Sequence, residues 1–490
     1  VTTAKLNADA VTGAKIADDA IDSEHYTDGS IDLAHLSSES VDESKLKVSN
    51  APTNGYVLSA QSGNTGGLTW AAVSGVASLG DLSDATTTAT SNIGLGANAV
   101  DSITTGDYNV GLGDGSGTAI TTGVENTAVG YNSLNETTTA SNNNAFGSET
   151  LRRNTTGGNN SAFGHQALNA NTTASNNAAF GWRALLANTT GTRNTSVGAN
   201  SLDSNTTGNY NTAVGKDALQ SSTTADSNTA VGDWALALTT TGASNTGLGK
   251  SSLQQNTTGS NNTAVGYYSL LYNTTGTRNT AVGNTALDAN TTANDNTSVG
   301  HAALGANTTG SVNVAMGSQA LYLNTTGTYN TAIGYSALYA NTTAGNNTAM
   351  GYNSLAANTT GTSNTGIGQA AIQTNTTGSN NVSIGLQSLN ANTTGNENVA
   401  VGNYALYSNT TAVDNTAIGT RSLFTNTTGT GNAALGYYAL NVSTGANNTA
   451  VGHFAMRLTT TASNNTAIGK SALYANTTAS WNTAVGANSL

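Results

Sequence analysis

The chain has 490 residues, of which 8% are charged and none is cysteine, and its formal net charge is −12. Globular domains carry about 25% charged residues, so this is not an average globular composition. The chain has only 14 Lys and Arg against 26 Asp and Glu, which argues against a nonspecific phosphate-binding surface, and we expect no nucleic-acid partner. The lack of cysteine excludes disulfides and thiolate metal sites. No stretch approaches the ~18 apolar residues of a membrane span, so none is expected in this segment.

Residues 1–50 consist of five decapeptides, the first two being VTTAKLNADA and VTGAKIADDA. Their apolar residues recur every five positions, for example at Val1, Leu6, Val11 and Ile16. This spacing fits neither a 3.6-residue helix nor the alternation of a strand. It predicts a shaft of extended or short-turn units whose apolar residues need partners from other chains.

Residues 51–85 form a second zone, in which YVL at 56–58 and LTW at 68–70 flank a segment rich in Gly, Asn and Ser. Two short strand-like runs separated by turn residues predict a β-hairpin. We interpret this zone as a small β connector.

Residues 86–490 repeat a 17-residue unit, N-T-A-V-G-x-x-A-L-x-x-N-T-T-G-x-x, which we number as repeat positions 1–17. From Asn92 to Leu490 the unit occurs 24 times, with the last copy incomplete. Position 1 is Asn and position 5 is Gly in every copy, position 4 is always apolar, and position 9 is nearly always Leu. Because residue 1 is Val and Leu490 falls within a repeat, we expect the sequence to be a segment of a longer chain.

A repeat this short cannot hold a helical hairpin, which needs about 33 residues. Thr, Val and Ile suit strands, and the Asn–Gly and Thr–Gly clusters suit turns. We therefore predict an all-β fold, a parallel β-solenoid or β-roll in which each repeat is one coil with two short strands, at positions 1–4 and 8–11. With ~4.8 Å between neighbouring strands, 24 coils would make a rod about 115 Å long.

The expected ladders are represented by eight residues in two neighbouring copies: Asn262, Val265, Gly266, Leu270, Asn279, Val282, Gly283 and Leu287. The Asn amides would hydrogen-bond from coil to coil, and Gly would form a corner with positive φ or a close backbone approach. Val and Leu would stack inside the coil, while positions 6, 7, 10, 11, 16 and 17 would face solvent. Burial of one Val and one Leu per coil stabilises the fold by less than the conformational entropy that is lost when 17 residues become ordered. We therefore expect further burial between chains, in a parallel homo-oligomer.

The N-T-A-V-G pattern resembles the head repeats of trimeric autotransporter adhesins. The decapeptides V-T-x-A-K-L/I-x-x-D-A resemble shaft repeats of bacteriophage tail fibres, especially those of cyanobacterial phages, and GYVLSA, GLTW and LGDLSDA resemble connector elements of the same fibres. The resemblance implies left-handed parallel β-rolls in a homotrimer, partnered by other virion or cell-surface structural proteins. It implies a tail fibre of a virion that extends a host-receptor-binding tip. The alternative that it leaves open is an adhesin or extracellular filament on a bacterial cell surface.

Aromatic residues at positions 6, 7 and 10 are candidate contacts for host surface glycans, foremost Tyr267, Tyr322, Trp182 and Trp234. The alternative is that these rings simply stack along the outside of the solenoid. The histidines that follow the position 5 glycine could meet around a shared axis and bind metal, but the same position also holds Tyr, Lys, Asp and Trp. We therefore expect no metal site there; these histidines are His165, His301 and His453.

N-T-T occurs 16 times, and each copy is formally an N-glycosylation sequon. Turn chemistry explains the same residues. The rows of threonine also match an ice-binding face, which is a third functional class beside fibre and adhesin. No Ser/His/Asp set, P-loop or paired-carboxylate pattern recurs, so we expect no enzymatic activity and no cofactor.

Overall fold

The computed structural model of the chain describes residues 56–60, 68–72, 85–86 and 91–490, and the decapeptide zone predicted to be a shaft lies outside these residues. The chain divides into two compact units, Val1–Ser83 and Asp84–Leu490. In the first unit, β1 (Tyr56–Ala60) pairs antiparallel with β2 (Leu68–Ala72), with Leu58 opposite Trp70. The antiparallel strand pair predicted for this segment is therefore present.

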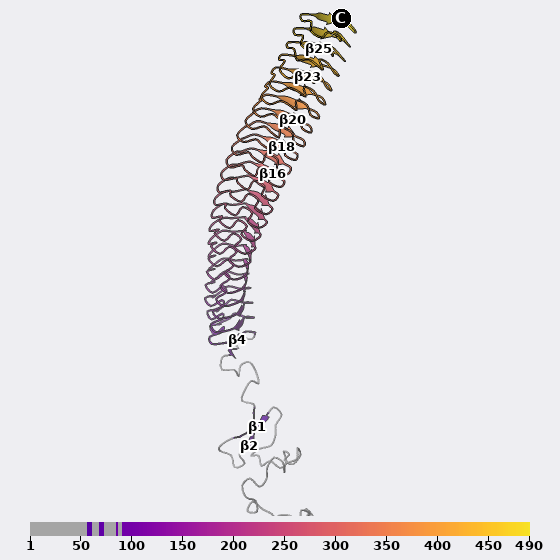
Figure 1. The fold of residues 1–490 in the computed structure, drawn as a ribbon. Helices are drawn as coiled ribbons and strands as arrows, with labels where there is room; N and C mark the ends of the chain where they lie inside the picture. Colours follow the sequence, from indigo (N-terminus) through magenta and orange to yellow (C-terminus); the bar gives the residue numbers. More distant parts are fainter. Residues whose placement is uncertain (1–55, 61–67, 73–84, 87–90) are drawn as a thin grey trace, which may run out of the picture. The chain divides into compact units, whose positions relative to one another are not determined.

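The second unit is a parallel β-solenoid, with one three-residue strand at positions 2–4 of each coil among the described residues (Figure 1). Its strands are β4 (Ile93–Leu95), β5 (Val110–Leu112), β6 (Thr127–Val129), β7 (Asn144–Phe146), β8 (Ser161–Phe163), β9 (Ala178–Phe180), β10 (Thr195–Val197), β11 (Thr212–Val214), β12 (Thr229–Val231), β13 (Thr246–Leu248), β14 (Thr263–Val265), β15 (Thr280–Val282), β16 (Thr297–Val299), β17 (Val314–Met316), β18 (Thr331–Ile333), β19 (Thr348–Met350), β20 (Thr365–Ile367), β21 (Val382–Ile384), β22 (Val399–Val401), β23 (Thr416–Ile418), β24 (Ala433–Leu435), β25 (Thr449–Val451), β26 (Thr466–Ile468) and β27 (Thr483–Val485).

Each strand pairs in parallel with the same repeat positions of the next coil, as in β14 and β15, where Thr263 faces Thr280 and Val265 faces Val282. The first coil is covered by β3 (Ala85–Thr86), which pairs antiparallel with β4. The register holds where the chain is one residue shorter, because Leu435 still faces Val451. The missing residue belongs to the Thr-Thr-Gly turn, so the deletion is absorbed outside the sheet. The parallel solenoid predicted from the repeat is confirmed.

The second strand predicted at positions 8–11 is wrong, because these residues form turns. Position 7 and position 9 both take left-handed backbone, with φ of 57° at Tyr268 and 51° at Leu270. Because left-handed residues recur at every second position, this segment cannot form a pleated strand. Its backbone N–H groups still donate hydrogen bonds to the next coil. Leu270 N donates to Ala286 O at 2.9 Å and Tyr272 N donates to Asp288 O at 2.9 Å.

Position 5 forms the corner between the strand and these turns. Gly266 has φ of +135°, and a Cβ placed there would lie 2.4 Å from the carbonyl oxygen of Gly283 in the next coil. Both conditions exclude a side chain, since L-residues avoid this φ and the neighbouring backbone occupies the space. These two constraints explain why position 5 is glycine in every copy.

The interior of the coil is narrow and is filled by positions 1, 3, 8, 9, 12 and 15. Ala264 at position 3 and Leu270 at position 9 are fully buried and belong to one hydrophobic cluster that runs along the solenoid. The prediction that position 4 also lies inside is wrong, because Val265 and Val282 are half-exposed on the outer face of the sheet. Successive strand residues point to opposite faces, so an inward position 3 forces positions 2 and 4 outward.

Candidate functional site

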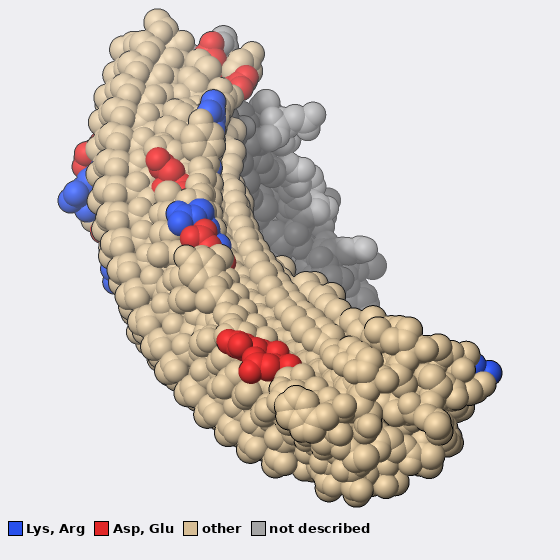
Figure 2. All heavy atoms as spheres, turned by 90° about the horizontal axis from the view of Figure 1, so that it is seen from above, with Lys and Arg blue, Asp and Glu red and all other residues tan. Residues whose placement is uncertain are grey.

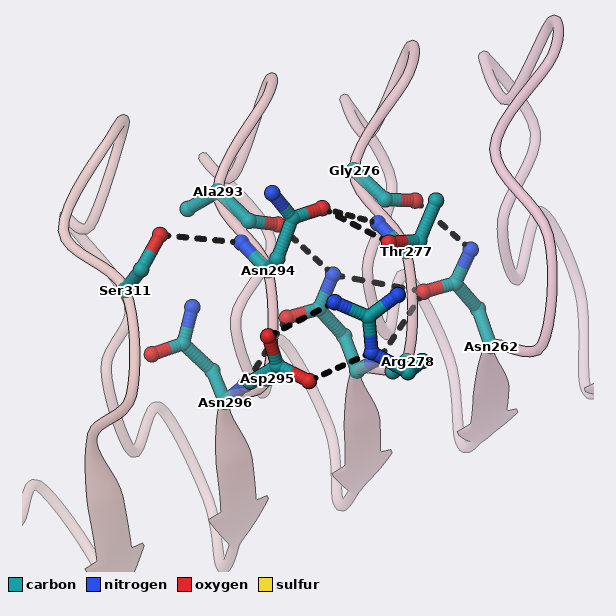
Figure 3. A network of polar contacts seen from close by, with 10 residues as sticks. Asn262, Gly276, Thr277, Arg278, Ala293, Asn294, Asp295, Asn296 and Ser311 are labelled. Atoms are coloured by element: carbon teal, nitrogen blue, oxygen red, sulfur yellow. Dashed lines mark hydrogen bonds and ion pairs between the residues drawn. The ribbon is translucent and has the colours of Figure 1, made fainter.

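The first ladder is formed by the position 1 asparagines, whose side chains bridge consecutive coils (Figure 3). Asn262 Nδ2 donates to Gly276 O at 2.8 Å and to Asn245 Oδ1 at 3.2 Å, and its own Oδ1 accepts from the backbone N of Asn279 at 2.9 Å. Asn262 is buried, so every donor and acceptor of the amide needs such a partner. Asn262 and Asn279 thus lie in one continuous row of amides.

A second ladder, at position 12, was not predicted from the sequence. Asn273 Nδ2 donates to Asn256 Oδ1 at 2.8 Å and to Gly276 O at 3.0 Å, and Asn273 is fully buried. These asparagines are the first residues of the N-T-T sequons. Their amide nitrogens, which a glycan would have to modify, point into the coil and donate hydrogen bonds there. The sequence feature that could have predicted this ladder is the recurrence of Asn at position 12 in most copies. A role in turns does not by itself explain why this residue is so often asparagine.

The position 12 ladder is interrupted where another residue replaces asparagine. Ser222 stands at this position, and its hydroxyl is buried without a hydrogen-bond partner. The Oδ1 of Asn205 in the preceding coil is also buried without a partner, because a serine is too short to reach it. The hydroxyls of Thr137 and Thr459, also at position 12, are orphaned in the same way. Each of these three breaks leaves a buried hydroxyl without a partner.

The threonines of the N-T-T turns have two different roles. At position 13 the hydroxyl donates to the carbonyl of the same position one coil further on, as Thr274 Oγ1 does to Thr291 O at 3.0 Å. At position 14 the side chain is exposed, as at Thr275. Only the second row of each pair is therefore free to contact solvent or a ligand with its hydroxyl.

The outer face of the sheet carries a continuous stripe of apolar side chains at position 4. Leu248 exposes 47% of its surface and Met316 exposes 43%, and Phe146, Phe163 and Phe180 stack at centroid distances of 4.6 and 4.9 Å. Positions 2 and 4 hold no charged residue in any of the 24 copies. Charged side chains form isolated spots on an otherwise uncharged surface (Figure 2).

The four aromatic residues predicted to contact glycans lie on separate coils and do not form one site. Trp182 is 49% exposed with the Arg183 guanidinium 5.2 Å from its ring centroid, and Trp234 has Lys216 Nζ at 5.5 Å. Tyr267 stacks on the adjacent Tyr268, and a hydrogen bond between the two hydroxyls raises the pKa of Tyr267.

Tyr322, the fourth of these residues, lines a shallow hollow of about 320 Å³ together with His301 and Asp288. The hollow exists because position 10 is Gly305 in this coil, and the Tyr322 ring lies over that glycine. Half-burial raises the pKa of Asp288 above its ordinary value, against the opposing effect of backbone N–H donors. Among residues 91–490 and the described strands before them, no three His, Asp or Glu side chains are grouped closely enough to hold a metal ion.

A larger aromatic cluster, missed in the sequence, covers positions 6, 7 and 10 of the coils between residues 403 and 474. The guanidinium of Arg421 lies 5.7 Å from the Tyr404 ring, 5.4 Å from Phe424 and 5.5 Å from Tyr438. That of Arg457 lies 4.6 Å from Phe454 and 5.2 Å from Tyr438. The signal was the concentration of Tyr, Phe and Arg at these three positions in successive copies.

Three ion pairs on the rest of the solenoid join neighbouring coils, and two others lie within one coil. Arg278 Nε donates to Asp295 Oδ1 at 2.6 Å, which lowers the pKa of Asp295 and raises that of Arg278 (Figure 3). Arg183 pairs with Asp203 at 3.1 Å; there the burial of Asp203 outweighs the arginine and raises the carboxyl pKa. The Arg278–Asp295 pair is largely exposed and contributes little to stability.

No family model matches the chain, and no curated protein matches its sequence. In the part of the chain that the structure describes, there is no helix long and apolar enough to cross a membrane.

Proposed function

We propose that this protein is a structural fibre protein, a virion tail fibre, in which parallel chains assemble through the apolar stripe at position 4. The observation that carries the proposal is the stripe itself, which continues without a charge through all 24 coils. A soluble monomer seldom exposes a contiguous apolar patch of more than a few hundred Å². With roughly 60 Å² exposed per residue, the stripe offers on the order of 1,500 Å² per chain, above the ~800 Å² per partner of a standard interface.

A parallel arrangement of identical chains suits this stripe because each coil presents the same side chain at the same height. A second copy in register would place apolar rows against apolar rows along the whole length. Three chains is the number implied by the resemblance to tail fibres and trimeric adhesins. In that assembly the solenoid is a spacer that extends a receptor-binding tip from the particle, with no catalytic step of its own.

Assembly is tested with Val265→Asp, Val282→Asp and Val299→Asp combined in one variant. Its matched control places three aspartates in the exposed position 14 row, at Thr275, Thr292 and Thr309. Light scattering after size exclusion should give a trimer mass for the wild type and the control. The stripe variant should dissociate, because a buried unpaired carboxylate costs several kcal/mol. A monomeric wild type at micromolar concentration refutes assembly through the stripe.

The location on a virion is tested separately by immunogold electron microscopy with antibodies raised against the solenoid. Label on thin appendages of phage particles supports the proposal. Label on the surface of uninfected bacterial cells would replace it with the bacterial adhesin.

A further inference from the structure

Among the described residues, five of the seven basic side chains before residue 400 have a carboxylate partner, the exceptions being Arg153 and Arg193, whereas none of the three after residue 400 has one. Arg183, Lys216 and Arg278 each form an ion pair with an aspartate, and Arg152 and Lys250 are likewise within reach of a carboxylate. In the part of the chain that the structure describes, Arg421, Arg457 and Lys470 form no ion pair. From residue 400 onward the sequence has these three basic residues and a single acidic one, Asp414. These coils of an acidic chain therefore carry a locally basic surface.

These three cations share one edge of the solenoid. They stand at positions 7, 10 and 6 of three of the four coils that begin at residues 415, 432, 448 and 465, after the corner glycine, whereas Asp414 stands at position 17, before the strand. Arg421 and Lys470 are exposed and Arg457 is half-buried. We name this surface the C-terminal patch, defined by Arg421, Arg457 and Lys470 and by the rings of Tyr404, Tyr437 and Phe454.

The rings of the patch hold the guanidinium groups without neutralising them. Arg421 Nη1 donates to Tyr438 OH at 2.7 Å and Arg457 Nη1 donates to Tyr474 OH at 3.2 Å. Each guanidinium has five N–H donors, so several remain for a ligand on each arginine. Tyr437 is 46% exposed and stacks on His453 at 5.3 Å, which presents a flat aromatic surface beside the cations.

We propose that the C-terminal patch binds an anionic polysaccharide, a pyranose chain that carries carboxylate or sulfate groups. The weakly positive C–H faces of a pyranose fit the negative faces of exposed aromatic rings. Carboxylate and sulfate groups fit the planar fork of arginine, which binds such anions in bidentate geometry. The patch spans five coils, roughly 20–25 Å at the ordinary strand spacing, so it can contact several consecutive sugar units. This property goes beyond the structural role and does not depend on the number of chains in the fibre.

Single-stranded nucleic acid also stacks on aromatic rings, but it is the poorer fit. It carries one phosphate per nucleotide, and such proteins follow the backbone with a positively charged groove. Here three cations lie on a chain whose net charge is −12. A polysaccharide with widely spaced charges meets the patch without bringing a dense row of phosphates against the acidic remainder.

The experiment measures binding of the full chain to three probes with one backbone: dextran, carboxymethyl-dextran and dextran sulfate. Biolayer interferometry at an ionic strength of about 50 mM should show binding to the two charged probes, at least tenfold tighter than to dextran, and weakening as salt screens the contacts. The variant Arg421→Gln with Arg457→Gln should lose about tenfold or more in affinity, the equivalent of one charge-assisted contact. Tyr437→Ser should lose about threefold.

The matched control is Arg183→Gln with Arg278→Gln, which changes the net charge by the same amount but removes arginines that are already paired. Tyr131→Ser is the control for the ring, because Tyr131 is an exposed position 6 tyrosine on a distant coil. Controls that bind like the wild type support the patch. Equal losses in patch and control variants, equal binding to dextran, or no binding overturn the proposal. Tighter binding of oligothymidylate than of carboxymethyl-dextran also overturns it, in favour of nucleic acid.

Discussion

Replacing Asn262 by Asp tests whether the position 1 amides act as donors in the ladder. The substitution keeps the shape and the acceptor oxygen but removes the Nδ2 group, which donates to Gly276 O at 2.8 Å and to Asn245 Oδ1 at 3.2 Å. A carboxylate there would face two oxygens in a buried site. Two lost hydrogen bonds at about 1 kcal/mol each, with the penalty for unpaired buried acceptors, give a loss of about 3 kcal/mol.

The variant also has a predictable pH dependence. Burial and the two facing oxygens raise the pKa of the new carboxyl above its unfolded value. A group with a raised folded pKa destabilises the fold as pH rises through that pKa. The loss should therefore be largest at neutral pH and should shrink in acid, where the protonated carboxyl can donate one hydrogen bond.

The measurement is hydrogen exchange by mass spectrometry, read from peptides that cover residues 245–296. A local probe is needed because a solenoid opens in segments rather than all at once. A loss of about 3 kcal/mol raises exchange in these coils by roughly a hundredfold.

The control is Asn294→Asp, the same chemical change one coil further on. Asn294 uses its Oδ1 as an acceptor from the backbone N of Thr277 at 2.7 Å, and Asp226 already plays this part for Asn209 at 2.6 Å (Figure 3). This variant should exchange like the wild type. If Asn262→Asp also changes exchange by less than threefold, the ladder is not held by amide donors.

Four further changes test other parts of the coil. Gly266→Val should lower the local opening free energy by more than about 3 kcal/mol, since its Cβ would strike Gly283 O and its φ is +135°; an unchanged melting curve contradicts the corner. Leu270→Asp should unfold the neighbouring coils by burying a charge, and wild-type exchange around residue 270 would refute its interior position. Asp288→Asn should stabilise the fold above about pH 4 and lose this advantage in acid, because the raised pKa of Asp288 makes its charged form unfavourable; equal stability at both pH values in thermal melts excludes this cause. Ser222→Asn should add about 2 kcal/mol by supplying the orphaned Asn205 Oδ1 with a donor, and urea unfolding no more resistant than that of Ser222→Ala would show that the ladder does not extend there.

The repeat predicts the stacking of coils because it fixes which residues must meet. Because Asn and Gly recur in every copy of a 17-residue period, neighbouring coils are expected to align equivalent positions. In this register Asn262 stacks on Asn245 and Gly266 stacks on Gly249. The conformation of positions 7–11 could not be predicted in the same way. Leucine strongly disfavours left-handed backbone, and yet Leu270 adopts it, because the coil-to-coil hydrogen bonds and the buried side chain outweigh the local preference.

The orientation of position 4 was mispredicted for a different reason. Size suggested that Val265 belongs inside, but the narrow interior takes the smaller Ala264 instead, because Leu270 already fills the space that faces the strand. Where glycine replaces alanine at position 3, as at Gly366, a Cβ would lie 3.1 and 3.3 Å from the side chains of Ile372 and Leu355 at position 9. A valine inside would overfill the coil, so the larger apolar residue lies on the outer face.

This inversion changes what the repeat encodes. Asparagine, alanine, leucine and glycine inside the coil satisfy the backbone and hold successive coils together, whereas the apolar residue at position 4 contributes little to that interior. A half-exposed or exposed apolar side chain in every copy adds little to the stability of an isolated coil, and a polar residue there would increase solubility. A face that stays apolar through Val, Ile, Leu, Met and Phe, while never becoming charged, is therefore best explained by contact with another surface. The same freedom from charge is missing at positions 6, 7 and 10, where Arg421 and its aromatic neighbours vary from coil to coil. The two proposals therefore concern different surfaces: assembly concerns the constant apolar face at position 4, and ligand binding concerns the variable edge at positions 6, 7 and 10.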